Sequence, residues 1–278
     1  FDGSLETDST FYILGGHGLD EIKGGAKEDV FLFAEAGRFG PGDKVDGGGG
    51  YDNFVLRGQY TIDFTSADYA GSIKGMESVT LASATDRRFG SPLAGEADYE
   101  IIAADDILGS GQVFTWNAGF LASAESFVFD GSRESDGHFR LVGGQGDDEM
   151  TGGAGHDLIY GNLGTDILKG NGGADTFRYD KVGESTSTAM DRILAFTGED
   201  VIDLGRIDAD DNTDGNQAFS FIGAEAFTNQ AGQLRAYQDP NNAGSWFAEA
   251  DTDGNGTADL VIHIESPGHP IGQGDFIL

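Results

Sequence analysis

Residues 143–178 read GGQGDDEMT-GGAGHDLIY-GNLGTDILK-GNGGADTFR, a nine-residue unit repeated four times without a gap. Glycine holds the first and fourth places of every unit, and aspartate holds the sixth. The eighth place is always large and apolar: Met150, Ile159, Leu168 and Phe177. A flexible glycine-rich linker has no reason to carry an apolar residue at every ninth position. The fixed short period therefore predicts a stacked solenoid.

The spacing also places the aspartates on top of one another. Places seven to nine suit a short strand whose eighth side chain points inward, and the six preceding residues must turn the chain, which glycine permits. With two units per coil, units two apart stack at roughly 4.8 Å. Asp148 should then lie over Asp166. Asp157 should likewise lie over Asp175.

Stacked carboxylates in a glycine turn indicate a calcium site. Two carboxylates this close repel each other unless a cation lies between them. The turn also leaves backbone carbonyls without ladder partners. Calcium meets both needs because it takes six to eight oxygen ligands in flexible geometry, whereas magnesium demands a compact octahedron and keeps its waters.

A second, less regular block lies near the start of the chain. Three of its units keep the sixth-place aspartate: GGHGLDEIK at 15–23, GGAKEDVFL at 24–32 and GGGGYDNFV at 47–55. The unit RFGPGDKVD before residue 47 retains only Asp43 and Val45 of the pattern, and a five-residue slip separates it from Leu32. This arrangement predicts a short β-roll with a loop in it.

Residues 56–142 lack the nonapeptide but show the alternation of strands. The strand-like stretches are TIDF at 61–64, ESVTL at 77–81, YEII at 99–102, QVFTW at 112–116, ESFVF at 125–129 and HFRLV at 138–142. We expect this segment to continue the solenoid and to bridge the two rolls. A carbohydrate-binding or catalytic surface stays open as an alternative here, although no motif marks one.

The repeat resembles the calcium-binding nonapeptide of the repeats-in-toxin (RTX) proteins. After Arg178 the chain continues with YDKVGESTSTAMDRILAF and DVIDLGRIDA, and it ends with Asp275-Phe276-Ile277-Leu278. Residues 143–278 resemble the carboxy-terminal domain of serralysin-type secreted metalloproteases. This resemblance implies a β-rich cap on the roll, an acidic-then-apolar type I secretion signal at the terminus, and the type I secretion machinery as partner.

The candidate Ca²⁺ ligands fall into side-chain and turn positions. The sixth-place aspartates are Asp20, Asp29, Asp52, Asp148, Asp157, Asp166 and Asp175. The turn positions are Gly16, Gly18, Gly48, Gly50, Gly143, Gly144, Gly146, Gly152, Gly153, Gly155, Gly161, Asn162, Gly164, Asn171 and Gly173.

A further constellation lies outside the repeats. Asp251, Asp253, Asn255 and Asp259 place oxygen donors at the spacing of the first half of an EF-hand loop. Ile262 stands where the bidentate glutamate of that loop belongs. Calcium binding and a plain acidic turn between strands both stay open for this segment.

Composition narrows the function further. The 278 residues include 16 basic and 48 acidic side chains, and the net charge of −32 argues against nucleic acid and anionic membranes as partners. No apolar run approaches the length of a transmembrane span. Cysteine is absent, which excludes thiol catalysis. There is no HExxH zinc motif, no GxSxG elbow and no phosphate-binding loop, so the chain itself is not expected to be an enzyme.

These observations predict an all-β protein, a parallel β-roll or β-helix solenoid in four segments. The segments are a first roll at 1–55, a β-rich bridge at 56–142, a second roll at 143–180 and a cap with the secretion signal at 181–278. The predicted function is that of a secreted bacterial calcium-binding module, disordered in low calcium and folded outside the cell.

Two other functions stay open. One is a polymer-degrading enzyme, or its remnant, acting on a protein or polysaccharide. The other is an adhesin or matrix module with a polysaccharide or cell-surface partner. Because the chain starts at Phe1 rather than methionine, it could be a whole protein or part of a longer one.

Overall fold

The four nonapeptides fold as the spacing predicts, with places seven to nine as strands. The strands are β13 (Glu149–Thr151), β14 (Leu158–Tyr160), β15 (Ile167–Lys169) and β16 (Thr176–Arg178). Their eighth-place side chains are all buried. β13 pairs in parallel with β15, and β14 with β16, in each case with partners eighteen residues apart. Two units therefore make one coil.

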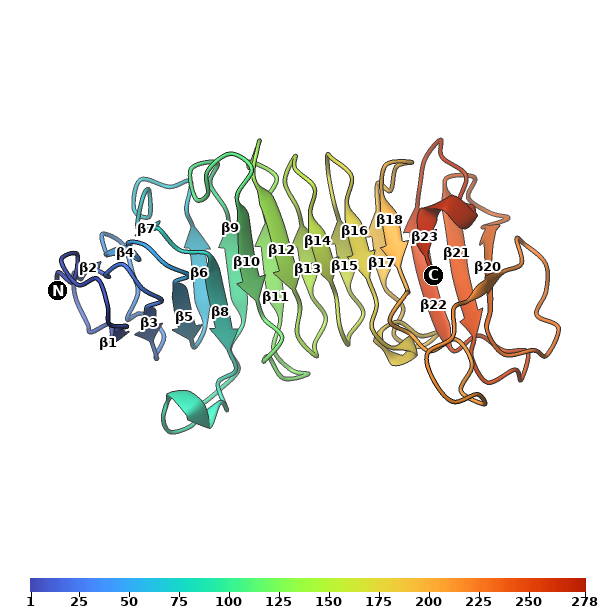
Figure 1. Ribbon diagram of the computed structural model, residues 1–278, viewed down its shortest axis with the longest axis horizontal. Coiled ribbons are helices and arrows are strands. Elements are labelled where there is room, and N and C mark those ends of the chain that lie inside the picture. Colours follow the sequence, from blue (N-terminus) through green and yellow to red (C-terminus); the bar gives the residue numbers. More distant parts are fainter.

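The computed structural model describes residues 1–278, which form one elongated solenoid with the amino terminus at one end (Figure 1). Its two long walls are ten-stranded sheets. The first sheet runs β1 (Tyr12–Leu14), β3 (Val30–Phe33), β5 (Asn53–Arg57), β8 (Ser78–Ala82), β10 (Val113–Asn117), β12 (His138–Val142), β14, β16, β18 (Val201–Asp203) and β23 (Phe276–Ile277). The second runs β6 (Tyr60–Asp63), β9 (Tyr99–Ile102), β11 (Phe127–Asp130), β13, β15, β17 (Arg192–Leu194), β22 (Leu260–Glu265), β21 (Ser245–Asp251), β20 (Gln233–Gln238) and β19 (Ser220–Phe221).

The amino-terminal block forms its own short wall opposite β1, β3 and β5. This third sheet contains β2 (Glu21–Lys23), β4 (Lys44–Asp46) and β7 (Ile73–Lys74). Glu21 pairs with Lys44, 23 residues on, and Val30 pairs with Asn53 at the same interval. This interval is the eighteen-residue coil plus the five-residue slip, so the predicted loop is accommodated without loss of register.

The bridging segment continues both long walls. Its predicted strands correspond to β6, β8, β9, β10, β11 and β12, and each pairs in parallel with its neighbours. Trp116 and Phe129 point inward with ring centroids 5.3 Å apart, and both are fully buried. One continuous core of buried residues runs from Ile22 to Phe276 through all four segments of the sequence.

The carboxy-terminal end is closed by a different kind of structure. β20, β21 and β22 are antiparallel, and β22 joins this hairpin set to the parallel wall at β17. β23 pairs with β18 and so ends the first sheet (Figure 1). Three short 3₁₀ turns, η1 (Arg87–Phe89), η2 (Val182–Glu184) and η3 (Gln273–Asp275), complete the elements. No helix in the structure has the length and apolar character that crossing a bilayer requires.

Candidate metal sites in the turns

Each sixth-place aspartate of the second roll lies at the junction of turn and strand. Asp157 accepts the backbone N–H of Phe139 from the previous coil at 2.6 Å with Oδ1, and that of Gly153 from its own turn at 2.6 Å with Oδ2. Asp148 is held in the same way by Phe127 and Gly144. The carboxylate thus sits under the turn, buried, and ties it to the coil before it.

The aspartates stack in the pairs that the spacing predicts. The backbone N–H of Asp148 donates to Asp166 Oδ1 at 2.9 Å, and that of Asp157 donates to Asp175 Oδ1 at 2.8 Å. The first roll carries a similar ladder, in which Asp29 N–H donates to Asp52 Oδ1 at 2.7 Å. Two lines of buried carboxylates therefore run along the turns of the second roll.

Some of these carboxylates retain an oxygen with no hydrogen-bond partner. Oδ2 is buried and unpartnered in Asp52, Asp166 and Asp175. A buried polar atom of this kind costs free energy unless a donor or a cation meets it. The unpartnered oxygens leave room for a donor or a cation in these turns.

The first-place glycines allow oxygens of successive coils to approach one another. A Cβ on Gly143 would collide with Asp148 Oδ2 and with the carbonyl oxygen of Gly161, which belongs to the next coil. Gly152 has the same relation to Asp157 Oδ2 and the carbonyl of Gly170. Carboxylate and carbonyl oxygens of successive coils therefore converge where the glycine has no side chain. A donor set made only of hard oxygens suits calcium.

In the first roll, Gly16 and Gly24 also lie against the sixth-place aspartates. Gly16 N–H donates to Asp20 Oδ2, and a Cβ on Gly24 would collide with Asp29 Oδ2 and the carbonyl of Gly47. Three of the other candidate glycines have positive φ, which suits glycine: Gly18 at 100°, Gly48 at 94° and Gly50 at 126°.

The two turn asparagines connect adjacent turns. Asn162 and Asn171 have φ of 65° and 73°, and their side-chain Nδ2 atoms donate to the carbonyls of Gly143 and Gly152 at 2.7 Å. These hydrogen bonds use the amide nitrogens and leave the oxygens of both asparagines as candidate ligands.

Burial changes the acidity of the stacked aspartates. It raises the pKa of Asp157 to about 6 and that of Asp148 and Asp175 to about 7. The pKa of Asp166 rises to about 9, because the charge of Asp191 adds to the effect of burial. A bound cation would favour the ionised form of each carboxylate and so offset this cost of burial.

Two further aspartates continue the ladders beyond the repeat, and the nine-residue pattern does not predict them. Asp166 N–H donates to Asp191 Oδ1 at 2.9 Å, and Asp175 N–H donates to Asp200 Oδ1 at 3.0 Å. Both acceptors are buried, and Asp191 Oδ2 has no partner. They follow their predecessors by 25 residues instead of 18, which hides them from a search at fixed period. Their only signal is an isoleucine two residues later in DRIL and DVID.

The first roll also holds acids that continue its ladders. Asp43 accepts the N–H of Asp20 at 2.8 Å and that of Gly40 at 2.8 Å, so the degenerate unit keeps the structural role of its aspartate. Glu77 Oε2 accepts the N–H of Asp52 at 2.7 Å. The ladder thus continues from Asp52 into the bridging segment through a glutamate.

The fourth-place glycines allow the close stacking of the coils to be tested. Gly164 has φ of 138°, and a Cβ there would collide with the carbonyl of Gly146 in the coil below. Gly164→Ala is therefore expected to destabilise the calcium-loaded protein by about 1–3 kcal/mol, from the backbone conformation alone. Gly172→Ala is the matched control, because its Cβ would lie 3.6 Å from its nearest neighbour. Equal thermal midpoints for the two variants would contradict this packing.

The acidic segment at 251–259 forms the turn of the β21–β22 hairpin. Oxygens of Asp251, Asp253 and Asp259 lie within 4.8 Å of one another. Asp251 is fully buried and accepts the N–H groups of Gly254 and Gly256, both at 2.8 Å. The side chain of Asn255 accepts the N–H of Thr257 at 2.7 Å. The resemblance to an EF-hand ends there, because the residue at place twelve, Ile262, is a core residue of β22.

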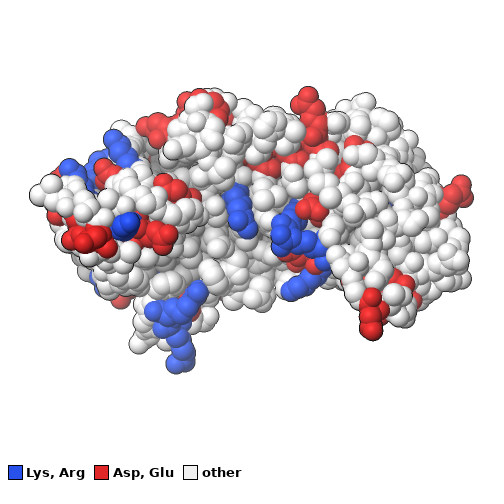
Figure 2. Space-filling view, in the orientation of Figure 1, with Lys and Arg blue, Asp and Glu red and all other residues white.

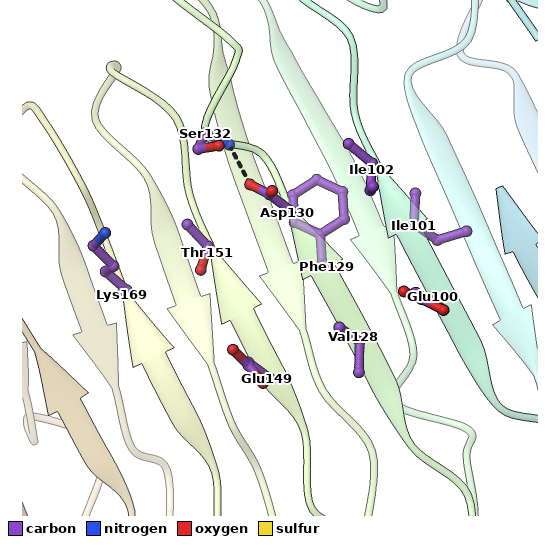
Figure 3. Close-up of a pocket in the computed structure, with 10 residues that line it drawn as sticks. All are labelled: Glu100, Ile101, Ile102, Val128, Phe129, Asp130, Ser132, Glu149, Thr151 and Lys169. Atoms are coloured by element: carbon purple, nitrogen blue, oxygen red, sulfur yellow. Dashed lines mark hydrogen bonds between the residues drawn. The ribbon is translucent and has the colours of Figure 1, made fainter. Parts of the chain in front are cut away.

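A hollow lies on the outer face of β9, β11, β13 and β15, where the bridging segment meets the second roll. Its volume is about 400 Å³, and Glu100, Asp130 and Glu149 line it together with Lys169 (Figure 3). Asp130 accepts the N–H of Ser132 at 2.9 Å. These side chains lie on the outer face because alternate side chains of a strand point away from the core.

Charge is unevenly spread over the visible face. Figure 2 shows acidic groups at both ends and along the turns, whereas basic side chains form a few separate groups. One basic group lies on the protruding loop that carries η1, where Arg87 and Arg88 are exposed. The acids in the turns are mostly buried, so the ladders account for only part of the red surface.

The parallel walls, the eighteen-residue coils and the aspartate ladders define the chain as an RTX-type β-roll. Residues 139–278, half of the chain, match the family described as Peptidase M10 serralysin C terminal, and the chain belongs to this family. None of the curated proteins matches it. The family is the non-catalytic carboxy-terminal part of the serralysins, which are secreted bacterial proteins exported by the type I route.

Proposed function

We propose that this chain is a calcium-binding RTX module that folds when it meets extracellular Ca²⁺ and that supports type I secretion through its carboxy-terminal end. Two observations carry the proposal: Oδ2 of Asp52, Asp166 and Asp175 is buried without a hydrogen-bond partner, and Oδ2 of Asp148 and of Asp157 converges with a carbonyl oxygen of the next coil. Family membership supports secretion, and the donor chemistry supports calcium.

The proposed ligands in the second roll are the ladder aspartates together with turn carbonyls. Asp148, Asp157, Asp166 and Asp175 supply the side-chain oxygens, and the carbonyls of the first-place glycines of the next coil complete the shells. Asp191 and Asp200 extend the set at the cap, since they continue the same two ladders. When bound, calcium supplies the positive charge that lets these carboxylates stay ionised in a buried turn.

The first roll and the hairpin add further candidate sites. Asp20, Asp29 and Asp52 are proposed as ligands because they occupy the same place in similar turns. Asp251, Asp253 and Asp259 are proposed as a separate site in the β21–β22 turn, where their oxygens already lie together. The cap would then respond to calcium as the roll does.

In the low-calcium cytosol, the same features favour an unfolded chain. Ordering a glycine-rich turn costs more backbone entropy than ordering other residues. The net charge of −32 adds self-repulsion to that cost. Since binding occurs only in the folded coils, its free energy becomes folding free energy. Export as an unfolded chain and folding outside follow from this coupling.

Replacing Asp157 with alanine tests the ligand assignment. The variant loses the side-chain oxygens of the sites bordering Asp175 and leaves the N–H groups of Phe139 and Gly153 without their acceptor. Calcium titration by calorimetry should show fewer bound ions and a weaker overall affinity. The control is Glu149→Ala, which removes an exposed acidic side chain from β13, the preceding strand in the chain. An Asp157→Ala variant that titrates like the parent would refute the assignment.

A further inference from the structure

Glu134 is a buried carboxylate outside every nonapeptide. Its residue is 1% exposed, and Oε1 accepts the N–H groups of Asp136 at 3.0 Å and Gly137 at 2.8 Å. Oε2 is buried and has no hydrogen-bond partner, and no lysine, arginine or histidine forms an ion pair with this side chain. An ionised carboxylate in that position is costly unless a cation meets the free oxygen.

The location of Glu134 relates it to the first complete turn of the second roll. The two coils are in register, with Arg140 of β12 paired to Leu158 of β14. The N–H of Ala154 donates to the carbonyl of Glu134 at 2.9 Å, and a Cβ built on Gly153 would lie 3.3 Å from Glu134 Cγ. Glu134 therefore lies over the turn that carries Asp157.

The coil of Glu134 has no acid at the sixth place. Phe139 occupies that place, and its N–H donates to Asp157 Oδ1. Glu134 thus brings a carboxylate into the turn from a different position of the coil. Its charge is also among the influences that raise the pKa of Asp157, after the larger effect of burial.

A second buried glutamate in the bridge shows what a purely structural carboxylate looks like here. Both oxygens of Glu125 accept backbone N–H groups, those of Ala84 at 2.8 Å, Ala97 at 3.2 Å and Ala122 at 2.8 Å. Glu125 is 3% exposed and has no unpartnered oxygen. The free Oε2 of Glu134 is therefore a property of that residue and not of buried glutamates in this segment.

We propose that Glu134 Oε2 and the Asp157 carboxylate bind one divalent cation, calcium by its preference for hard oxygens, at the junction of the bridging segment and the second roll. This inference rests on the proposed calcium-dependent function. It moves the start of the calcium-dependent structure from the first nonapeptide back into the bridge, so that ion binding also clamps β12 and the turn before it to the roll.

Glu134→Gln tests the site with little disturbance. The amide keeps an oxygen to accept the N–H groups of Asp136 and Gly137, and it replaces only the unpartnered oxygen with a group that cannot bind a cation. Calcium titration calorimetry, with bound calcium counted after equilibrium dialysis, should give one ion fewer than the parent. Glu149→Gln removes the same charge from an exposed site and should leave the count unchanged.

Thermal unfolding at low and at saturating calcium supplies the second readout. As calcium rises from the lowest concentration at which both proteins are folded, the melting temperature of Glu134→Gln should increase less than that of the parent. A variant with the parent's ion count, or one whose melting temperature increases as much as the parent's, would overturn the inference. A parent that binds no calcium would instead refute the proposed function itself.

Discussion

Stripping the protein of calcium is expected to unfold the two rolls and to lose most of the β-sheet signal in far-ultraviolet circular dichroism. The reason is the number of coupled sites. Each site at a hundred times its dissociation constant contributes about 2.7 kcal/mol to folding. A few sites acting together therefore match the roughly 5–15 kcal/mol that stabilises an ordinary domain. Returning calcium in the range of roughly 0.1–1 mM should restore the signal in one cooperative step.

Magnesium provides the control for this experiment. It prefers a compact octahedron and gives up its waters reluctantly, so the same titration with magnesium should leave the chain largely unfolded. A chain that is fully folded in chelator and unchanged by calcium would reduce the aspartate ladders to scaffold. The outer face of residues 56–142, with its hollow beside Glu100 and Asp130, would then become the first place to look for function.

The cooperativity follows from how the ladders connect the coils. Each sixth-place aspartate of the second roll accepts an N–H from the coil before it, as Asp166 does from Asp148, and each donates its own N–H to the next. A turn that loses these contacts weakens its neighbours on both sides. Stability in a stacked array of this kind is a sum of nearest-neighbour terms, and under the proposed function a bound ion adds to each of them.

The coil geometry was predictable because every coil of the second roll repeats the same constraints. A period of nine with an apolar eighth place leaves one register for β13 to β16, and that register puts Asp148 over Asp166. Strand alternation located the bridging strands for a similar reason, since inward residues such as Trp116 must be apolar. In these segments, the local sequence pattern and the packing of the core favour the same structure.

The residues that escaped prediction depend on contacts between segments of unequal length. Asp191 and Asp200 occupy ladder places after an interval of 25 residues, so no fixed period finds them. The carboxylate of Glu134 reaches its turn from a position of the coil other than the sixth place, so the repeat pattern does not predict it. The antiparallel order of β20, β21 and β22 depends on which partner each strand finds in the cap, and alternation alone does not specify a partner.

In chelator, acidification from about pH 8 to about pH 5 should favour the folded state and restore part of the lost β-sheet signal. The folded-state pKa values of Asp148, Asp157, Asp166 and Asp175 lie between about 6 and about 9, above the ordinary value of 3.8. Between those limits the folded chain binds more protons than the unfolded chain, so its stability falls as the pH rises. Protons then partly replace the missing cation.

With calcium present the dependence should reverse, because the ligands must be deprotonated to bind and acid releases the ion. Circular dichroism in chelator and thermal melts in calcium across this pH range separate the two regimes. Asp166→Asn mimics the protonated side chain at the ladder aspartate whose pKa is raised most, so in chelator at pH 8 it should keep more β-sheet signal than the parent. In calcium it should melt below the parent. A chelated parent whose stability is flat or rises from pH 5 to pH 8 would mean that the buried aspartates do not carry this cost, and the need for a cation in the turns would lose its electrostatic basis.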